Sequence, residues 1–234
     1  MRINKFLAMH GIASRRMIDR LVENGKVKVN GEVASLGQEV SDKDSISVDG
    51  KKIDITKSIN FEYYLLNKPL SVLCTLKDEA RGRLKVTDIV KSKERIYPVG
   101  RLDYMTEGLI ILTNDGEIVN KLLHPSRQVW KQYYCIVDSP ILEEHIGKWK
   151  KSIVLDDGPT LSAKIKRDSK RNDAIFIEIA EGRNRQIRRM MGYFRYSVKY
   201  LQRLRIGEIE LDKDLVVGKY RRLTEKEINY LRSL

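Results

Sequence analysis

The sequence has few of the residues that build cofactor, metal and hydrolase sites. None of its 15 glycines lies two positions from another, and Gly-Lys-Ser/Thr does not occur. This argues against phosphate-cradling and dinucleotide-binding loops and, less strongly, against a Rossmann-type methyltransferase. The three histidines, His10, His124 and His145, are far apart, without metal-ligand spacing, and no Gly-x-Ser-x-Gly is present. We expect neither a cofactor nor a metal.

Cysteine and long apolar runs are also scarce. The two cysteines, Cys74 and Cys135, are too few and too isolated for a disulfide framework or a thiolate metal site, so we expect both in the core. The N-terminal segment lacks the apolar run of a signal peptide, and no later run approaches the roughly 18 apolar residues of a membrane span. The sequence therefore predicts a cytoplasmic protein without a membrane partner.

Positive charge is abundant. The chain has 45 Lys and Arg against 32 Asp and Glu, a formal charge of +13, and an isoelectric point near 9.6. Such a field favours a polyanion as partner. At 234 residues the chain is long enough for a sizeable core, and we expect two folding units.

The first 50 residues predict two helices followed by a small hairpin sheet. Apolar spacing indicates a helix over residues 3–9, and Ser14 begins a second one. Val27 and Val29 alternate with lysines, and Asn30-Gly31 is a strong two-residue hairpin signal. Basic residues gather on the helices and first strand, where a surface that follows a nucleic-acid backbone needs them. They are Arg2, Lys5, Arg15, Arg16, Arg20, Lys26 and Lys28.

We divide the chain into a first domain over residues 1–55, a linker over 56–61 and a second domain over 62–234. In the second domain, strand-like runs alternate with helix-like segments, which predicts one mixed α+β domain. A closing helix follows Thr224, which caps it, and Glu227 completes a capping box. The strand-like runs are residues 63–67, 96–99, 109–113, 133–137 and 175–180.

Asp103 lies between two apolar strand patterns, in YPVGRLDYMTEGLIILT. A loop anchored by two buried strands is where scaffolded proteins often place working side chains. The alternative is that Asp103 caps a turn or pairs with its neighbour Arg101, and this structural role is the one we prefer from the segment alone, since Arg-Leu-Asp by itself decides nothing.

A second basic concentration is EGRNRQIRRMM, residues 181–191. If Asn184 starts a helix, Ile187 and Met190 share its apolar stripe, and Arg188 lies at the edge of that stripe. A buried guanidinium needs a partner, and Asp103 would supply one that keeps the carboxylate ionised. The alternative is an exposed basic helix whose arginines contact phosphates, which fits Arg183, Arg185 and Arg189 equally well.

Several motifs together carry a family resemblance. The order RINKFLA, GIASRR and VKVNG resembles the S4 RNA-binding domain. Gly100-Arg101-Leu102-Asp103 with Thr106 and Gly108-Leu109 resembles the GRLDxxTxGL signature of the pseudouridine synthases that modify bacterial ribosomal RNA. Further stretches agree: LLNKP, RGR at 81–83, VWKQYYCIV, EGRNRQIRRM and LQRLRIGEIEL. The resemblance implies a small S4-like α/β domain followed by a mixed, mainly antiparallel β-sheet catalytic domain with flanking helices.

The resemblance also implies the residue roles. Asp103 matches the family's catalytic carboxylate, Tyr133 its active-site tyrosine, and Arg188 the basic residue that pairs with the carboxylate. Strand alternation would send Tyr134 to the opposite face. The expected substrate and RNA contacts are Arg101, Lys68, Arg183, Arg185, Gln186 and Arg189.

These features predict an isomerase that converts a specific uridine of ribosomal RNA to pseudouridine on a flipped-out base, without a cofactor. The single catalytic domain and the DDGPTLSAKI segment favour 23S over 16S RNA. The expected partner is ribosomal RNA or a subunit assembly intermediate, and the protein is expected to act as a monomer. The alternative is an S4-type RNA-binding ribosome assembly protein without catalysis, which leaves residues 97–112 and 181–191 as scaffold.

Overall fold

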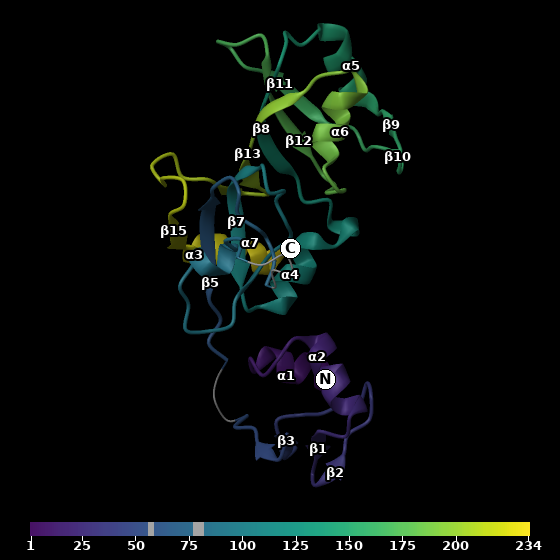
Figure 1. Cartoon of the computed structure of the whole chain (residues 1–234), viewed down its shortest axis with the longest axis vertical. Coiled ribbons are helices and arrows are strands. Elements are labelled where there is room, and N and C mark those ends of the chain that lie inside the picture. Colours follow the sequence, from purple (N-terminus) through teal and green to yellow (C-terminus); the bar gives the residue numbers. More distant parts are fainter. Residues whose placement is uncertain (56–58, 77–81) are drawn as a thin grey trace. The chain divides into compact units, whose positions relative to one another are not determined.

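The computed structural model describes residues 1–55, 59–76 and 82–234 and divides into two compact units (Figure 1). The N-terminal unit comprises Met1–Glu62, Lys93–Arg95 and Asn114–Gly116; the remaining residues form the C-terminal unit. Part of the predicted linker, residues 56–58, and Arg81 of the RGR motif lie outside the described residues. Within the described ranges, no helix is both long and apolar enough to cross a membrane.

The N-terminal unit has the predicted order of two helices and a small antiparallel sheet. Ser14 Oγ accepts a hydrogen bond from Met17 N at 3.3 Å and so caps the second helix. Asn30 and Gly31 have φ of 53° and 94° and form the predicted two-residue hairpin. The elements are α1 (Ile3–Met9), α2 (Arg15–Glu23), β1 (Val27–Val29), β2 (Glu32–Val33), β3 (Ile46–Val48) and β4 (Lys51–Lys52), with sheet order β2-β1-β3-β4.

A separate core holds this unit together. Ile3 and Leu7 of α1, Ile18 of α2, Val27 of β1 and Ile46 of β3 have no exposed surface. Alternation along β1 places Lys28 on the opposite, exposed face of the small sheet. The basic side chains therefore surround a packed scaffold.

One mixed sheet organises the C-terminal unit. Its strands run in the order β11-β12-β8-β13-β7-β5-β15, with β14 paired to β13 and β6 paired to β7. All described pairs are antiparallel except β13 with β7. The strands are β5 (Tyr63–Lys68), β6 (Tyr97–Pro98), β7 (Glu107–Thr113), β8 (Lys131–Val137), β11 (Lys164–Arg167), β12 (Ala174–Ile179), β13 (Val198–Ile206), β14 (Ile209–Glu210) and β15 (Tyr220–Arg222). A separate hairpin pairs β9 (Val154–Leu155) with β10 (Gly158–Pro159).

Helices α5 and α6 cover the half of the sheet that contains β11 and β13 (Figure 1). They are joined by the fully buried Trp149, whose Nε1 donates to Met190 O at 2.9 Å. The predicted Thr224 cap and capping box with Glu227 begin the last helix. The helices are α3 (Val86–Ile89), α4 (Gly116–Leu123), α5 (Glu143–Lys151), α6 (Gln186–Tyr193) and α7 (Glu225–Ser233).

The sequence interpretation that Asn184 starts the second basic helix is wrong. Arg185 adopts a left-handed conformation with φ of 47°, and α6 begins one residue later, at Gln186. The predicted apolar stripe is present, because Ile187 and Met190 are both buried.

The only parallel strand pair in the described sheet is a very close one. Strands β7 and β13 share two residue pairs, Gln202 with Glu107 and Arg203 with Gly108. Gly108 has φ of 102°, and a Cβ atom at this position would lie 2.2 Å from Arg203 O and 2.7 Å from Arg203 N. Glycine is therefore required where the two halves of the sheet meet.

Both cysteines are buried, as predicted from their isolation in the sequence. Cys135 lies in β8, where burial raises the pKa of its thiol to about 12. Cys74 Sγ accepts a hydrogen bond from Leu102 N at 3.4 Å, and burial raises its pKa as well. Cys74 therefore helps to fix the segment between β6 and β7.

Candidate active site

The loop that carries Asp103 connects β6 to β7 and is anchored at several points. Gly100 has φ of 74° and lets the chain turn beside α4. Leu102 is buried, and Thr106 N donates to Asp103 O at 3.0 Å. Ser71 N donates to Tyr104 O at 2.8 Å. The anchored loop predicted from the flanking strands is present.

Arg188 lies next to Asp103, as the sequence analysis predicted. Its Nε is 4.0 Å from Asp103 Oδ2, and the two side chains are 15% and 30% exposed. Nη1 donates to Val198 O at 3.3 Å and Nη2 to Met105 O, whereas the buried Nε has no hydrogen-bond partner. Burial, together with the charge of Arg185, lowers the pKa of the Arg188 guanidinium, and Asp103 opposes this shift.

Asp103 and Arg188 line a cavity of about 150 Å³ in the C-terminal unit. A protein cavity of about this volume holds one six-membered ring such as benzene. Asp103 is the only carboxylate among the described lining residues, and Tyr133 from β8 forms part of the wall. Apolar side chains complete the wall: Val99, Leu102, Leu122, Leu123, Ile179, Ile187, Leu201 and Ile206.

Alternation along β8 separates its two tyrosines. Tyr133 is buried and faces the cavity. Tyr134 packs on the other face, with ring centroids 4.9 Å from Phe176 and 6.4 Å from Tyr200. The predicted opposite orientation of the two residues is confirmed.

Arg101 and Arg185 are the exposed arginines that line the cavity. In the described part of the chain, neither side chain forms a hydrogen bond or ion pair. Their charges are therefore available to a ligand at the cavity entrance.

The other predicted RNA contacts of the second basic segment have partners within the protein. Arg189 binds Asp157 through two hydrogen bonds of 2.8 and 2.9 Å, and that carboxylate is about half exposed. Arg183 also contacts Asp157, and it bonds Glu181 at 3.0 Å and the carbonyls of the β9–β10 hairpin. The hydrogen bonds to Asp157, chiefly those from Arg189 and then that from Arg183, lower its pKa to about 2.

These contacts revise the predicted roles. Arg183 lines the cavity but binds the hairpin, and Arg189 does not line the cavity. Gln186 lines it too, although its amide is buried and bonded to Arg183 N and Glu181. In this structure all three side chains are bonded within the protein and position the start of α6. The predicted RNA contacts of Arg183, Gln186 and Arg189 would therefore require these side chains to leave their present partners.

The prediction that Lys68 contacts phosphate is wrong. The side chain has no exposed surface, and its Nζ donates to Pro69 O and Thr106 O, each at 2.8 Å. Burial lowers its pKa. Because Thr106 also bonds Asp103, Lys68 supports the Asp103 loop from inside the sheet.

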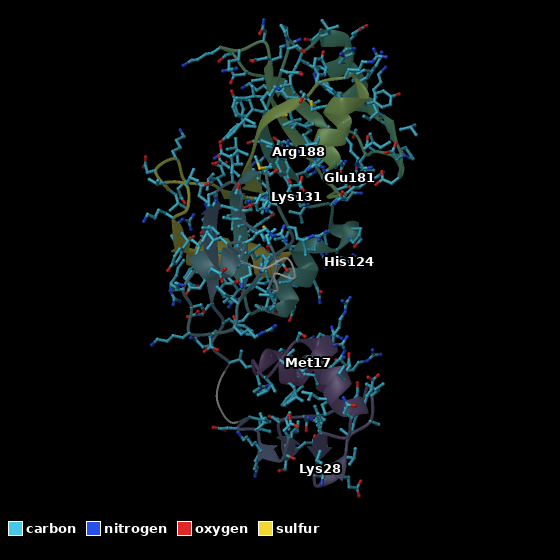
Figure 2. The ribbon with its side chains drawn as sticks, in the orientation of Figure 1. Met17, Lys28, His124, Lys131, Glu181 and Arg188 are labelled. Atoms are coloured by element: carbon cyan, nitrogen blue, oxygen red, sulfur yellow. The ribbon has the colours of Figure 1, made fainter. Side chains whose placement is uncertain are left out.

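Sequence reasoning missed three polar residues that line the cavity: Thr106, Lys131 and Arg203. Lys131 stands two residues before Tyr133, so strand alternation could have placed it on the same face. Figure 2 labels Lys131 and Arg188, which both belong to the cavity wall. Arg203 is opposite Tyr133 in the β8–β13 register, which the sequence does not reveal.

The predicted basic cluster of the N-terminal unit is present on its surface. Arg15, Arg16 and Arg20 of α2 are exposed, and Met17 beside them is half exposed (Figure 2). Among the cluster residues, Lys26 is engaged in an ion pair with Asp49 at 3.2 Å. Arg2 and Lys28 are exposed, and Lys5 is half-buried.

The chain is similar to known proteins over its whole length. A family model described as RNA pseudouridylate synthase matches residues 62–193, and an S4 domain model matches residues 1–46. The chain is 41% identical to ribosomal large subunit pseudouridine synthase B of Bacillus subtilis, over all of this chain and 96% of that protein. It is 37% identical to the dual-specificity RNA pseudouridine synthase RluF of Escherichia coli, over 97% and 77% of the two chains. A solved structure titled crystal structure of pseudouridylate synthase has a TM-score of 0.72, at 28% identity over 99% of both chains.

Proposed function

The chain belongs to the RNA pseudouridine synthases, and we propose that it converts a specific uridine of 23S ribosomal RNA to pseudouridine. The observation that carries the proposal is the Asp103–Arg188 pair in the wall of a cavity the size of one ring. The printed name of the Bacillus subtilis relative, a ribosomal large subunit enzyme, supports the choice of the large subunit. We propose that the RNA is bound either free or in a ribosomal assembly intermediate. We also propose that the protein acts in the cytoplasm and as a monomer.

Asp103 is the proposed catalytic carboxylate. In the reaction, the C1′–N1 bond of uridine breaks and a C1′–C5 bond forms, while C5 loses a proton and N1 gains one. Asp103 can attack C6 of the base or C1′ of the sugar, or stabilise positive charge on the sugar while C2′ loses a proton. Arg188 supports all three routes, since a neighbouring cation favours the ionised carboxylate.

The nucleotide must leave its stack before the carboxylate reaches it, which costs a few kcal/mol. Tyr133 offers a ring for the extruded base to stack on, and such stacking contributes about 1–3 kcal/mol per base. Arg101 and Arg185 then contact the neighbouring nucleotides or phosphates. The basic face of α2 adds affinity through phosphate contacts away from the cavity.

The test combines chemical mapping of pseudouridine in ribosomal RNA with substitution of Asp103. Deleting the gene should remove one or a few pseudouridines, and the Asp103→Asn variant should fail to restore them while binding RNA with nearly unchanged affinity. Asp214→Asn, which changes an exposed carboxylate outside the cavity, is the matched control and should restore them fully. Normal modification by Asp103→Asn would refute the enzymatic role of this residue, and an unchanged map after gene deletion would favour the binding-only alternative.

A further inference from the structure

Two cations that the family resemblance did not assign lie on the cavity face of the sheet. Lys131 and Tyr133 alternate along β8, so their side chains point to the same face. In the antiparallel β8–β13 pair, Arg203 is directly opposite Tyr133, which places its side chain on that face as well. All three residues line the cavity.

The hydrogen bonding of Arg203 is incomplete. The residue is only 3% exposed, its Nε donates to Leu109 O at 2.7 Å, and its buried Nη2 has no hydrogen-bond partner. Within the described residues it forms no ion pair with a carboxylate. A buried guanidinium nitrogen without an acceptor is destabilising. Thr106 Oγ1, on the same cavity, is also buried without a partner.

Lys131 is in a similar position. Its Nζ donates to Val129 O at 2.8 Å. Burial, and then the charge of Arg203, lower the pKa of Lys131 to about 8, and no acidic group acts against them. Two cations that repel each other inside one cavity are stabilised by an electron-rich ligand between them.

We propose that Lys131 and Arg203 bind the carbonyl oxygens of the target uracil and hold the negative charge that the base gains when its C1′–N1 bond breaks. The inference rests on the proposed function. The electron pair of the broken bond leaves with the base, and the charge spreads over N1 and the two carbonyl oxygens. When C5 bonds to C1′, the C5 proton passes to water and N1 takes a proton from water, so the step balances while both cations keep their protons.

The same contacts select uracil over cytosine. Cytosine carries an amino donor where uracil has a carbonyl oxygen, and two donors that face each other cannot form a hydrogen bond. Sites built to bond a particular polar group reject a ligand that leaves their own buried groups unpaired. A phosphate would be the other anionic ligand, but the apolar walls and volume of the cavity favour a ring, and exposed Arg101 and Arg185 remain for phosphates.

The experiment measures single-turnover release of tritium from RNA labelled at C5 of uridine. Lys131→Met keeps an unbranched side chain only one atom shorter and removes its charge. It should lower the rate by about 100-fold, the range seen when one donor to a developing oxyanion is removed. Lys131→Arg should recover a substantial part of that loss. Lys164→Met is the matched control, because this lysine is exposed and lies over the Trp130 ring outside the cavity; its rate should stay within about twofold of wild type.

A binding measurement supplies the second arm. In the Asp103→Asn background, which is not expected to turn over, RNA with uridine at the mapped site should bind more tightly than RNA with cytidine there. Arg203→Met and Lys131→Met should reduce this preference. If Arg203→Met fails to fold, Arg203→Lys and Lys131→Met answer the same question.

The outcomes separate this inference from the proposed function. Wild-type protein that releases no tritium contradicts the proposed function. Active wild type with Lys131→Met within about twofold of its rate overturns the inference alone. A loss confined to RNA affinity, with an unchanged single-turnover rate and an unchanged preference for uridine, also overturns it, because the cations would then hold a phosphate.

Discussion

Replacing Gly108 with alanine is expected to destabilise the C-terminal unit strongly. The new Cβ atom would lie 2.2 Å from Arg203 O and 2.7 Å from Arg203 N, both backbone atoms that cannot rotate away. Relieving the contact requires β7 and β13 to separate by roughly 1 Å. The described register of these two strands consists of two residue pairs, Glu107 with Gln202 and Gly108 with Arg203.

The magnitude follows from two contributions. A non-glycine residue at φ of 102° is strained by about 1–3 kcal/mol. Each backbone hydrogen bond lost from the strand pair removes a further ~1 kcal/mol. We therefore expect the free energy of unfolding to fall by about 3–5 kcal/mol, and Tm of a unit of this size by roughly 10 °C. Activity should fall too, because Arg203 lines the cavity beside this contact.

Thermal unfolding followed by tryptophan fluorescence is the appropriate assay, since both tryptophans, Trp130 and Trp149, belong to the C-terminal unit. The matched control is Gly147→Ala in α5, where a Cβ meets nothing within 4 Å. Alanine inside a helix should stabilise by about 0.5–1 kcal/mol, so its Tm should rise slightly. A Gly108→Ala variant with the Tm of wild type, or equal decreases in both variants, would refute the reasoning.

Two further predictions concern the charged residues. Asp157→Asn should lower Tm at neutral pH by removing the contact with its two arginines, and the difference from wild type should shrink as pH falls from about 4 to about 2. Folding lowers the pKa of Asp157 from its ordinary 3.8 to about 2, so the stabilisation by its carboxylate is present above pH 3.8 and is lost on acidification. A difference in Tm that does not change with pH would contradict this prediction. Replacing the three exposed arginines of α2, Arg15, Arg16 and Arg20, by alanine should weaken RNA binding. The slope of log affinity against log salt concentration should become shallower by about 2, at roughly 0.7 per phosphate contact. An unchanged slope would show that these residues do not contact RNA.

Short-range sequence patterns predicted where helices and the first hairpin form, and they predicted the pairing of Asp103 with Arg188. Ser14 and Thr224 cap their helices because short-range hydrogen bonds decide helix starts. The hairpin at Asn30 follows from backbone preference in the same way. The contact of Arg188 with Asp103 was predictable because a guanidinium at the edge of an apolar stripe needs an acidic partner.

The errors arose where the partner comes from a distant part of the chain. Lys68 was expected at the surface because lysine is rarely fully buried, and only the fold brings Pro69 O and Thr106 O to its ammonium. Arg189 is bound by Asp157, which lies 32 residues earlier in the sequence. Arg203 reaches the cavity through strand register, which alternation within one strand does not give.

The two buried thiols provide the protein with natural reporters of motion on two scales. Cys74 accepts a hydrogen bond from Leu102 in the Asp103 loop, so local opening of that loop exposes it to a thiol reagent. Cys135 lies within β8, between β12 and β13, and reacts only when the sheet itself opens. Comparing the labelling rates of the two sites would separate fluctuations of the Asp103 loop from unfolding of the sheet that supports it, without introducing a new cysteine.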